Sequence, residues 1–133
     1  MSLAELHTEV VDRVLIARIE GEVDMSNAAE IGSAISDRIS NESLGLVLDL
    51  SSVGYMDSAA IHTLFELRAG LRNRGQEMRL VIPPDATVAH ALRIMDVPRT
   101  IGAAESNEAA VESIVAAVPQ ARSALGSNLD RDH

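Results

Sequence analysis

The chain has 133 residues, of which 47% are hydrophobic, and a formal net charge of −9. This length and apolar content predict one domain with a buried core. The acidic charge argues against direct binding to nucleic acid or to anionic membranes, because both select basic patches. Cysteine is absent, so disulfides, thiolate metal sites and cysteine nucleophiles are excluded.

The N-terminal segment does not resemble a targeting sequence. Glu5 and Glu9 stand where a signal peptide would have its apolar region. No apolar run in the sequence approaches the roughly 20 residues that span a bilayer. We therefore expect a cytoplasmic protein that does not insert into a membrane.

Two strands and a helix are predicted at the start of the chain. Residues 3–10 and 14–19 are the strands, joined as a hairpin, and residues 21–24 break the pattern. A helix follows Ser26 or Asn27, either of which can cap it. The spacing of Asn27 and Glu30 is that of a capping box. The core face of this helix is expected to comprise Ala28, Ile31, Ala34, Ile35 and Ile39.

The middle of the chain predicts a central strand and a long helix. Residues 44–50 are nearly all apolar, as in a strand covered on both faces, and residues 51–55 are expected to form a turn. The helix after this turn ends near Gly75. Its core face recurs at helical spacing and comprises Ala60, Ile61, Leu64, Phe65, Leu67 and Leu71.

The C-terminal third predicts one more strand and two helices. Residues 78–82 form the strand, and residues 83–85 open a helix that closes at residues 97–98. Residues 100–101 are a candidate edge strand, and residues 107–118 the last helix. The inward residues of the earlier helix are expected to be Val88, Ala91, Leu92 and Met95. Ser106 is expected to cap the last helix.

Strands alternate with helices after the first hairpin, which implies parallel strands joined by right-handed crossovers. We therefore predict an α/β fold, a mixed β-sheet with about four helices packed against it. Residues 1–118 are expected to form the single domain, and residues 119–133 a flexible polar tail.

The sequence contains no recognisable catalytic or metal-binding motif. The four histidines are scattered, and HExxH, Walker A, GxGxxG and GxSxG patterns are absent. His62 follows Ser58 by one helical turn, but no orienting acid for a catalytic pair is evident. We expect neither an enzyme nor a cofactor nor a metal site. The enzymatic alternative is a small hydrolase that uses Ser58 as its nucleophile.

The pair Asp57-Ser58 is the most informative feature. It lies between the central strand and the long helix, where either residue can cap the helix and contribute about 1 kcal/mol. The same position also suits a modified hydroxyl, because the free N–H groups and the macrodipole at a helix N-terminus tolerate an anion.

Two segments carry a family resemblance. Residues 21–24 (GEVD) and residues 49–58 (DLSSVGYMDS) resemble the STAS domain of bacterial anti-sigma factor antagonists, in a match that runs from about residue 6 to residue 118. The resemblance implies a STAS-type fold. It also implies an antagonist that binds an anti-sigma factor serine kinase and so releases a sigma factor.

The resemblance further implies a switch at Ser58. The kinase would phosphorylate this serine and inactivate the antagonist, and a PP2C-type phosphatase would restore it. Asp24 and Asp57 match the family's flanking acids, beside which a phosphate would repel the partner. The expected partner-binding residues are Asp24, Asp57, Ser58, Ala60, Ile61 and His62.

Two positions depart from the family pattern, which usually has Gly at the position of Ala60 and an apolar residue at that of His62. The Ala60 methyl is expected to crowd a partner's active site. The alternative function is a STAS scaffold or regulatory subunit of a stress-signalling or transporter complex, with Ser58 unmodified. The sequence leaves the oligomeric state open between monomer and weak dimer.

Overall fold

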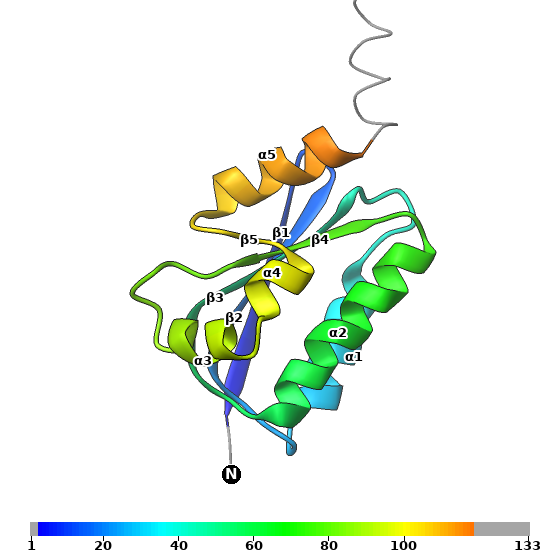
Figure 1. Cartoon of the computed structure of the whole chain (residues 1–133). Coiled ribbons are helices and arrows are strands. Elements are labelled where there is room, and N and C mark those ends of the chain that lie inside the picture. The colour runs from blue at the N-terminus through cyan, green and yellow to red at the C-terminus, as the bar shows by residue number, and fades with distance from the viewer. Residues whose placement is uncertain (1–2, 119–133) are drawn as a thin grey trace, which may run out of the picture.

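The computed structural model describes residues 3–118. They form a five-stranded sheet with helices on both faces (Figure 1). The strands are β1 (Ala4–Val11), β2 (Val14–Val23), β3 (Gly45–Met56), β4 (Glu77–Val81) and β5 (Ala103–Ala104). The helices are α1 (Ala28–Arg38), α2 (Ser58–Asn73), α3 (Ala89–Ile94), α4 (Val97–Ile101) and α5 (Asn107–Ala117). The expected tail, residues 119–133, lies outside the described part.

The sheet has the order β1-β2-β3-β4-β5. β1 pairs with β2 in antiparallel fashion through the hairpin at Asp12 and Arg13, both of which have positive φ angles. β2, β3, β4 and β5 pair in parallel. The predicted α/β fold, with a mixed sheet and parallel crossovers, is confirmed.

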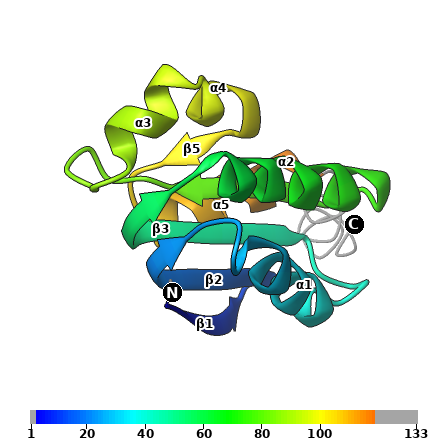
Figure 2. The ribbon, with the colours of Figure 1, turned by 90° about the horizontal axis from the view of Figure 1, so that it is seen from below.

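The helices divide unequally between the two faces of the sheet: Figure 2 shows α1 and α2 in front of the sheet and α5 behind it. One hydrophobic cluster joins α1, α2, α3 and α4 to the sheet and contains its most deeply buried leucines, among them Leu46, Leu48, Leu50 and Leu80. On the other face, α5 is the one helix of the described part of the chain that packs on the sheet; its Ala110, Val111 and Ile114 contact Val14, Ile16, Val47 and Val81. Within residues 3–118, no other helix packs on that second face, and α5 lies over only part of it.

Two strands extend beyond their predicted ends. β2 continues through Gly21 to Val23, and β3 continues through Ser51–Tyr55, which the sequence predicted to be a turn. Both predictions were wrong, because the two extensions pair with each other and so satisfy their backbone groups. The pairing has register shifts after Arg18 and after Gly21. Gly21 has a φ of +110°, and a Cβ there would clash with the Leu3 carbonyl oxygen.

The predicted third helix was placed too early and made too long. The chain turns after Pro83, and α3 begins only at Ala89. Met95 is half-exposed and Ala91 is exposed, so only Val88 and Leu92 of the predicted inward set are buried. Val97 and Pro98 begin α4, where proline is tolerated in the first turn. The edge strand is Ala103–Ala104, and residues 100–101 belong to α4.

The other helices follow the sequence closely. Gly75, with a φ of +71°, follows the C-terminus of α2, and Ser106 caps α5 by accepting a hydrogen bond from Ala109 N. The predicted capping box at Asn27 is wrong, because the Asn27 side chain makes no cap hydrogen bond.

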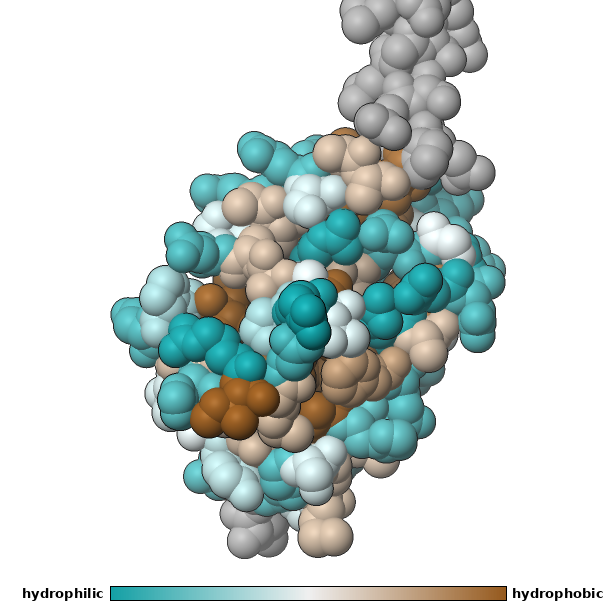
Figure 3. All heavy atoms as spheres, viewed as in Figure 1, coloured by the Kyte–Doolittle hydropathy of each residue, from teal (hydrophilic) through white to brown (hydrophobic). Residues whose placement is uncertain are grey.

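Hydrophobic surface on this side of the molecule gathers over α3 (Figure 3), whose exposed apolar residues include Ile94.

Candidate functional site

The carboxylate of Asp57 organises the junction between β3 and α2. Asp57 is the N-cap of α2, and its Oδ1 accepts a hydrogen bond from Ala60 N at 3.0 Å. Its Oδ2 accepts a second hydrogen bond from Met25 N at 3.0 Å. One side chain thus caps the helix and holds the turn between β2 and α1 beside it.

Ser58 is the first residue of α2 and is exposed. Because Asp57 supplies the cap, the Ser58 hydroxyl is not needed for one, and no hydrogen bond joins its Oγ to another described residue. The sequence left open whether Asp57 or Ser58 caps α2, and the structure shows that Asp57 is the cap. The Ser58 hydroxyl faces solvent at a helix N-terminus, where backbone N–H groups outnumber their acceptors.

Asp24 lies in the turn that Asp57 holds. Its Oδ1 accepts hydrogen bonds from Ser26 N at 2.9 Å and from Ser26 Oγ at 2.6 Å. Asn27 secures the same turn, accepting from Asp24 N at 3.0 Å and donating to Glu22 O at 2.9 Å. The structure therefore brings Asp24, Asp57 and Ser58 together at one end of the sheet.

The remaining expected partner-binding residues separate into two groups. Ala60 and Ile61 are buried, with exposures of 1% and 7%, and pack in the main core. The Ala60 methyl therefore lies below the surface, and its expected effect on a partner's active site stays a prediction. His62 is exposed, and its Nε2 lies 3.2 Å from Glu66 Oε1. It points toward Glu66 along α2 and has no hydrogen bond to Ser58.

Two exposed apolar residues near the site were missed by the sequence analysis. Met25 is 83% exposed and follows Asp24, and Tyr55 is 50% exposed and precedes Asp57 by two residues. Aromatic residues and Met are enriched in protein interfaces. A signal was present for Tyr55, because it is the only tyrosine of a chain with 2% aromatic residues.

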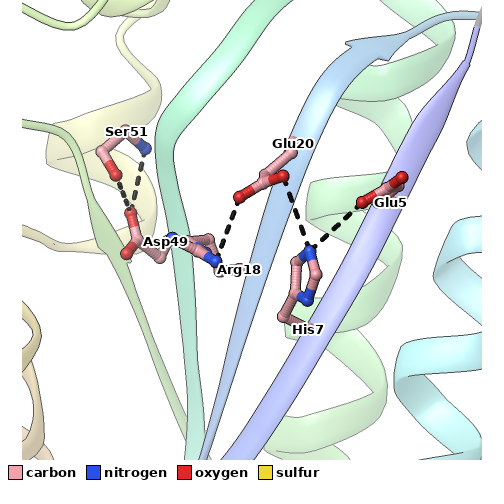
Figure 4. Close-up of polar contacts among 6 residues, drawn as sticks. All are labelled: Glu5, His7, Arg18, Glu20, Asp49 and Ser51. Carbon is pink, nitrogen blue, oxygen red and sulfur yellow. Dashed lines mark hydrogen bonds and ion pairs between the residues drawn. The ribbon is translucent and has the colours of Figure 1, made fainter.

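A second polar cluster lies on strands β1, β2 and β3, on the face of the sheet that carries α5 (Figure 4). Asp49, 5% exposed, accepts hydrogen bonds from Ser51 N at 2.9 Å and Ser51 Oγ at 2.6 Å. Arg18 Nη2 lies 3.0 Å from Glu20 Oε1. His7 Nε2 lies 3.5 Å from Glu20 Oε2 and 3.5 Å from Glu5 Oε2. The Asp49–Ser51 part of the family motif thus has a structural role in shaping β3.

The family model for the STAS domain matches residues 5–111. The chain belongs to the STAS domain family. The recognised motif and the site at Ser58 both lie within the matched residues.

Solved structures of similar fold support this placement. An anti-sigma factor antagonist from Mycobacterium paratuberculosis aligns with a TM-score of 0.73 at 21% identity, covering 84% of this chain and 94% of the other. The Bacillus cell fate determinant SpoIIAA in its phosphorylated form aligns with a TM-score of 0.61 at 18% identity, covering 83% of this chain and 99% of the other. A sulfate transporter family protein from Wolinella succinogenes aligns with a TM-score of 0.65 at 20% identity, covering 80% of this chain and 88% of the other.

At these identities the likeness establishes the fold. Among the helices within residues 3–118, none is both long enough and apolar enough to cross a membrane.

Proposed function

We propose that this chain is an anti-sigma factor antagonist that is switched off by phosphorylation of Ser58. In its unphosphorylated form it binds an anti-sigma factor serine kinase and so releases a sigma factor. A PP2C-type phosphatase reverses the modification. Because sigma factors act on RNA polymerase, this role places the protein in the cytoplasm.

The main support for the proposal is that Asp57 caps α2 while the neighbouring Ser58 is exposed. Asp57 makes the cap hydrogen bond to Ala60 N at 3.0 Å, so the exposed Ser58 hydroxyl can be modified without loss of the cap. A kinase needs such a free hydroxyl. Two of the similar structures are named as an anti-sigma factor antagonist and as a phosphorylated protein, which agrees with the same role.

The switch would act through charge and size at the surface. A phosphate adds about −1.5 to −2 charges at neutral pH and would stand next to Asp57 and near Asp24. The helix N-terminus offsets part of this charge, so the fold is retained. A partner surface fitted to the neutral hydroxyl, to Met25 and to Tyr55 would meet a concentrated negative charge instead.

A direct test is phosphorylation by the anti-sigma kinases of the source organism. The protein is incubated with ATP and each kinase, and the site is mapped by mass spectrometry. We expect one phosphoryl group at Ser58 and none on the Ser58→Ala variant. A phosphoryl group at another residue, or no phosphorylation by any of these kinases, would contradict the proposal.

A second candidate function is a scaffold or regulatory subunit of a transporter or stress-signalling complex. The similarity to the sulfate transporter family protein favours it. In that role Ser58 would stay unmodified and Ser58→Asp would bind the partner as well as the unaltered chain. Affinity capture with the unphosphorylated protein discriminates the two, since it returns a kinase in one case and transporter or scaffold subunits in the other.

A further inference from the structure

The polar cluster on strands β1, β2 and β3 contains three potential metal ligands that the family motif does not include. Glu5 and His7 stand two residues apart on β1, so their side chains lie on the same face of the sheet. Glu20 on β2 is the direct cross-strand partner of Glu5. The hairpin thus brings Glu20 beside Glu5 and His7, which precede it by more than ten residues in the sequence.

The distances within this cluster suit a metal ion. His7 Nε2 lies 3.5 Å from Glu5 Oε2 and 3.5 Å from Glu20 Oε2, and one ligand atom from each of the three residues lies within 4.8 Å of the others. Two ligands bound tetrahedrally to zinc at about 2.0–2.2 Å stand about 3.3–3.6 Å apart. The two measured separations from His7 therefore match two edges of a zinc coordination polyhedron.

The strand register supplies a separate reason for a cation. Glu5 and Glu20 face each other directly across an antiparallel pair, and like charges in that position destabilise a sheet. A cation between the two carboxylates would turn this repulsion into attraction. The neighbouring Arg18 does not fill that place, because its guanidinium lies 3.0 Å from Glu20 Oε1, on the oxygen turned away from His7.

Arg18 also orients the cluster. Its contact to Oε1 leaves Glu20 Oε2 directed at His7 (Figure 4). Arg18 in turn is the cross-strand neighbour of the buried Asp49. The carboxylates of Glu5 and Glu20 carry two negative charges against the one positive charge of Arg18, which leaves an excess of negative charge near the three ligand atoms. Outer groups of this kind commonly fix ligand orientation in metal sites.

We propose that Glu5, His7 and Glu20 bind a divalent transition-metal ion of the zinc type, with an open coordination position toward solvent. The imidazole nitrogen selects for zinc, cobalt or nickel over magnesium and calcium, which prefer oxygen ligands. The ion would tie the edge strand β1 to β2. This site lies on the opposite face of the sheet from the helix α2 that carries Ser58, and it is independent of the proposed antagonist function.

The test uses the full chain after removal of metals with a chelator. Zinc chloride is titrated by calorimetry, cobalt chloride by absorption spectroscopy, and magnesium chloride serves as the hard-cation comparison. We expect one zinc ion per chain, a cobalt spectrum with a nitrogen ligand, and no comparable magnesium binding. His7→Gln and Glu20→Gln should each weaken zinc binding by at least about 10-fold.

Glu9→Gln is the matched control, because Glu9 is exposed on the same strand and its loss changes the charge by the same amount as Glu20→Gln. We expect Glu9→Gln to retain zinc affinity within about 2-fold and the zinc-dependent rise in melting temperature that ligand binding produces. His7→Gln should melt normally without metal and lose that rise. Zinc binding that survives in His7→Gln, that falls equally in Glu9→Gln, or that is absent altogether would overturn the proposal.

Discussion

Asp57 and Met25 are 32 residues apart in the chain, and a hydrogen bond of 3.0 Å joins the Asp57 carboxylate to the Met25 backbone N–H. The other oxygen of the same carboxylate caps α2. The turn that carries Asp24 and the helix that carries Ser58 are therefore held by one side chain. This link explains how two loops that are distant in sequence can present a single surface.

Replacing Asp57 should destabilise both loops at once. Asp57→Ala removes a helix cap, which costs about 0.5–2 kcal/mol, and a second hydrogen bond, which contributes about 0.5–1.5 kcal/mol. We expect the free energy of unfolding to fall by about 2 kcal/mol in urea titrations. Ser58→Ala is the matched control and should change it by less than about 0.5 kcal/mol, because the Ser58 hydroxyl has no partner among the described residues. Equal losses in the two variants would show that Ser58 shares the capping role.

A negative charge at Ser58 should leave the fold intact. An acidic side chain in the first turn of a helix is favourable by about 0.3–1 kcal/mol, and repulsion from Asp57 acts against it. We therefore expect the Ser58→Asp variant to unfold within about 1 kcal/mol of the unaltered chain, while its affinity for the kinase falls. Ser33→Asp, at an exposed serine of α1, adds the same charge away from the site and should bind normally. Loss of binding together with loss of folding would contradict a local switch.

Gln76 should be a key residue for the loop between α1 and β3. It is 3% exposed, and its Nε2 donates hydrogen bonds of 2.9 Å to both Ser40 O and Ser43 O. Gln76→Leu leaves these two carbonyls without the donor and should cost about 1–3 kcal/mol. The exposed Asn73 provides the comparison, because Asn73→Leu should be nearly neutral. Chemical unfolding measures both, and a neutral Gln76→Leu would mean that water replaces the amide at no cost.

Gly70 should be a site for stabilisation. It lies in the interior of α2, and a Cβ added there would meet no atom within 4 Å. Gly70→Ala should therefore raise the free energy of unfolding by about 0.5–1 kcal/mol, since alanine is the better helix former. Gly21→Ala is the contrasting variant and should be strongly destabilising, because its Cβ would collide with the Leu3 carbonyl. A destabilised Gly70→Ala variant would show that the glycine is needed for a packing partner in solution.

The sequence alone determined the elements whose signals are local. The apolar run before Ser51, the helical spacing from Ala60 to Leu71 and the cap at Ser106 each depend on residues close in the chain, and the structure has all three elements. The motif ending at Asp57 and Ser58 was sufficient to indicate the family. The separate segment of residues 21–24 led to the prediction that Asp24 lies beside Ser58.

Only the tertiary structure decided which residue caps α2, which predicted site residues reach the surface, and where β2 and β3 end. Asp57 and Ser58 are both suitable caps by residue type, and the structure shows that Asp57 caps α2 while it also accepts a hydrogen bond from Met25 N in a distant turn. The two strands continue past their apolar segments because each supplies hydrogen-bond partners for the other. Glu5, His7 and Glu20 meet for the same reason: backbone pairing between strands sets which side chains become neighbours, and a local sequence pattern does not contain that pairing.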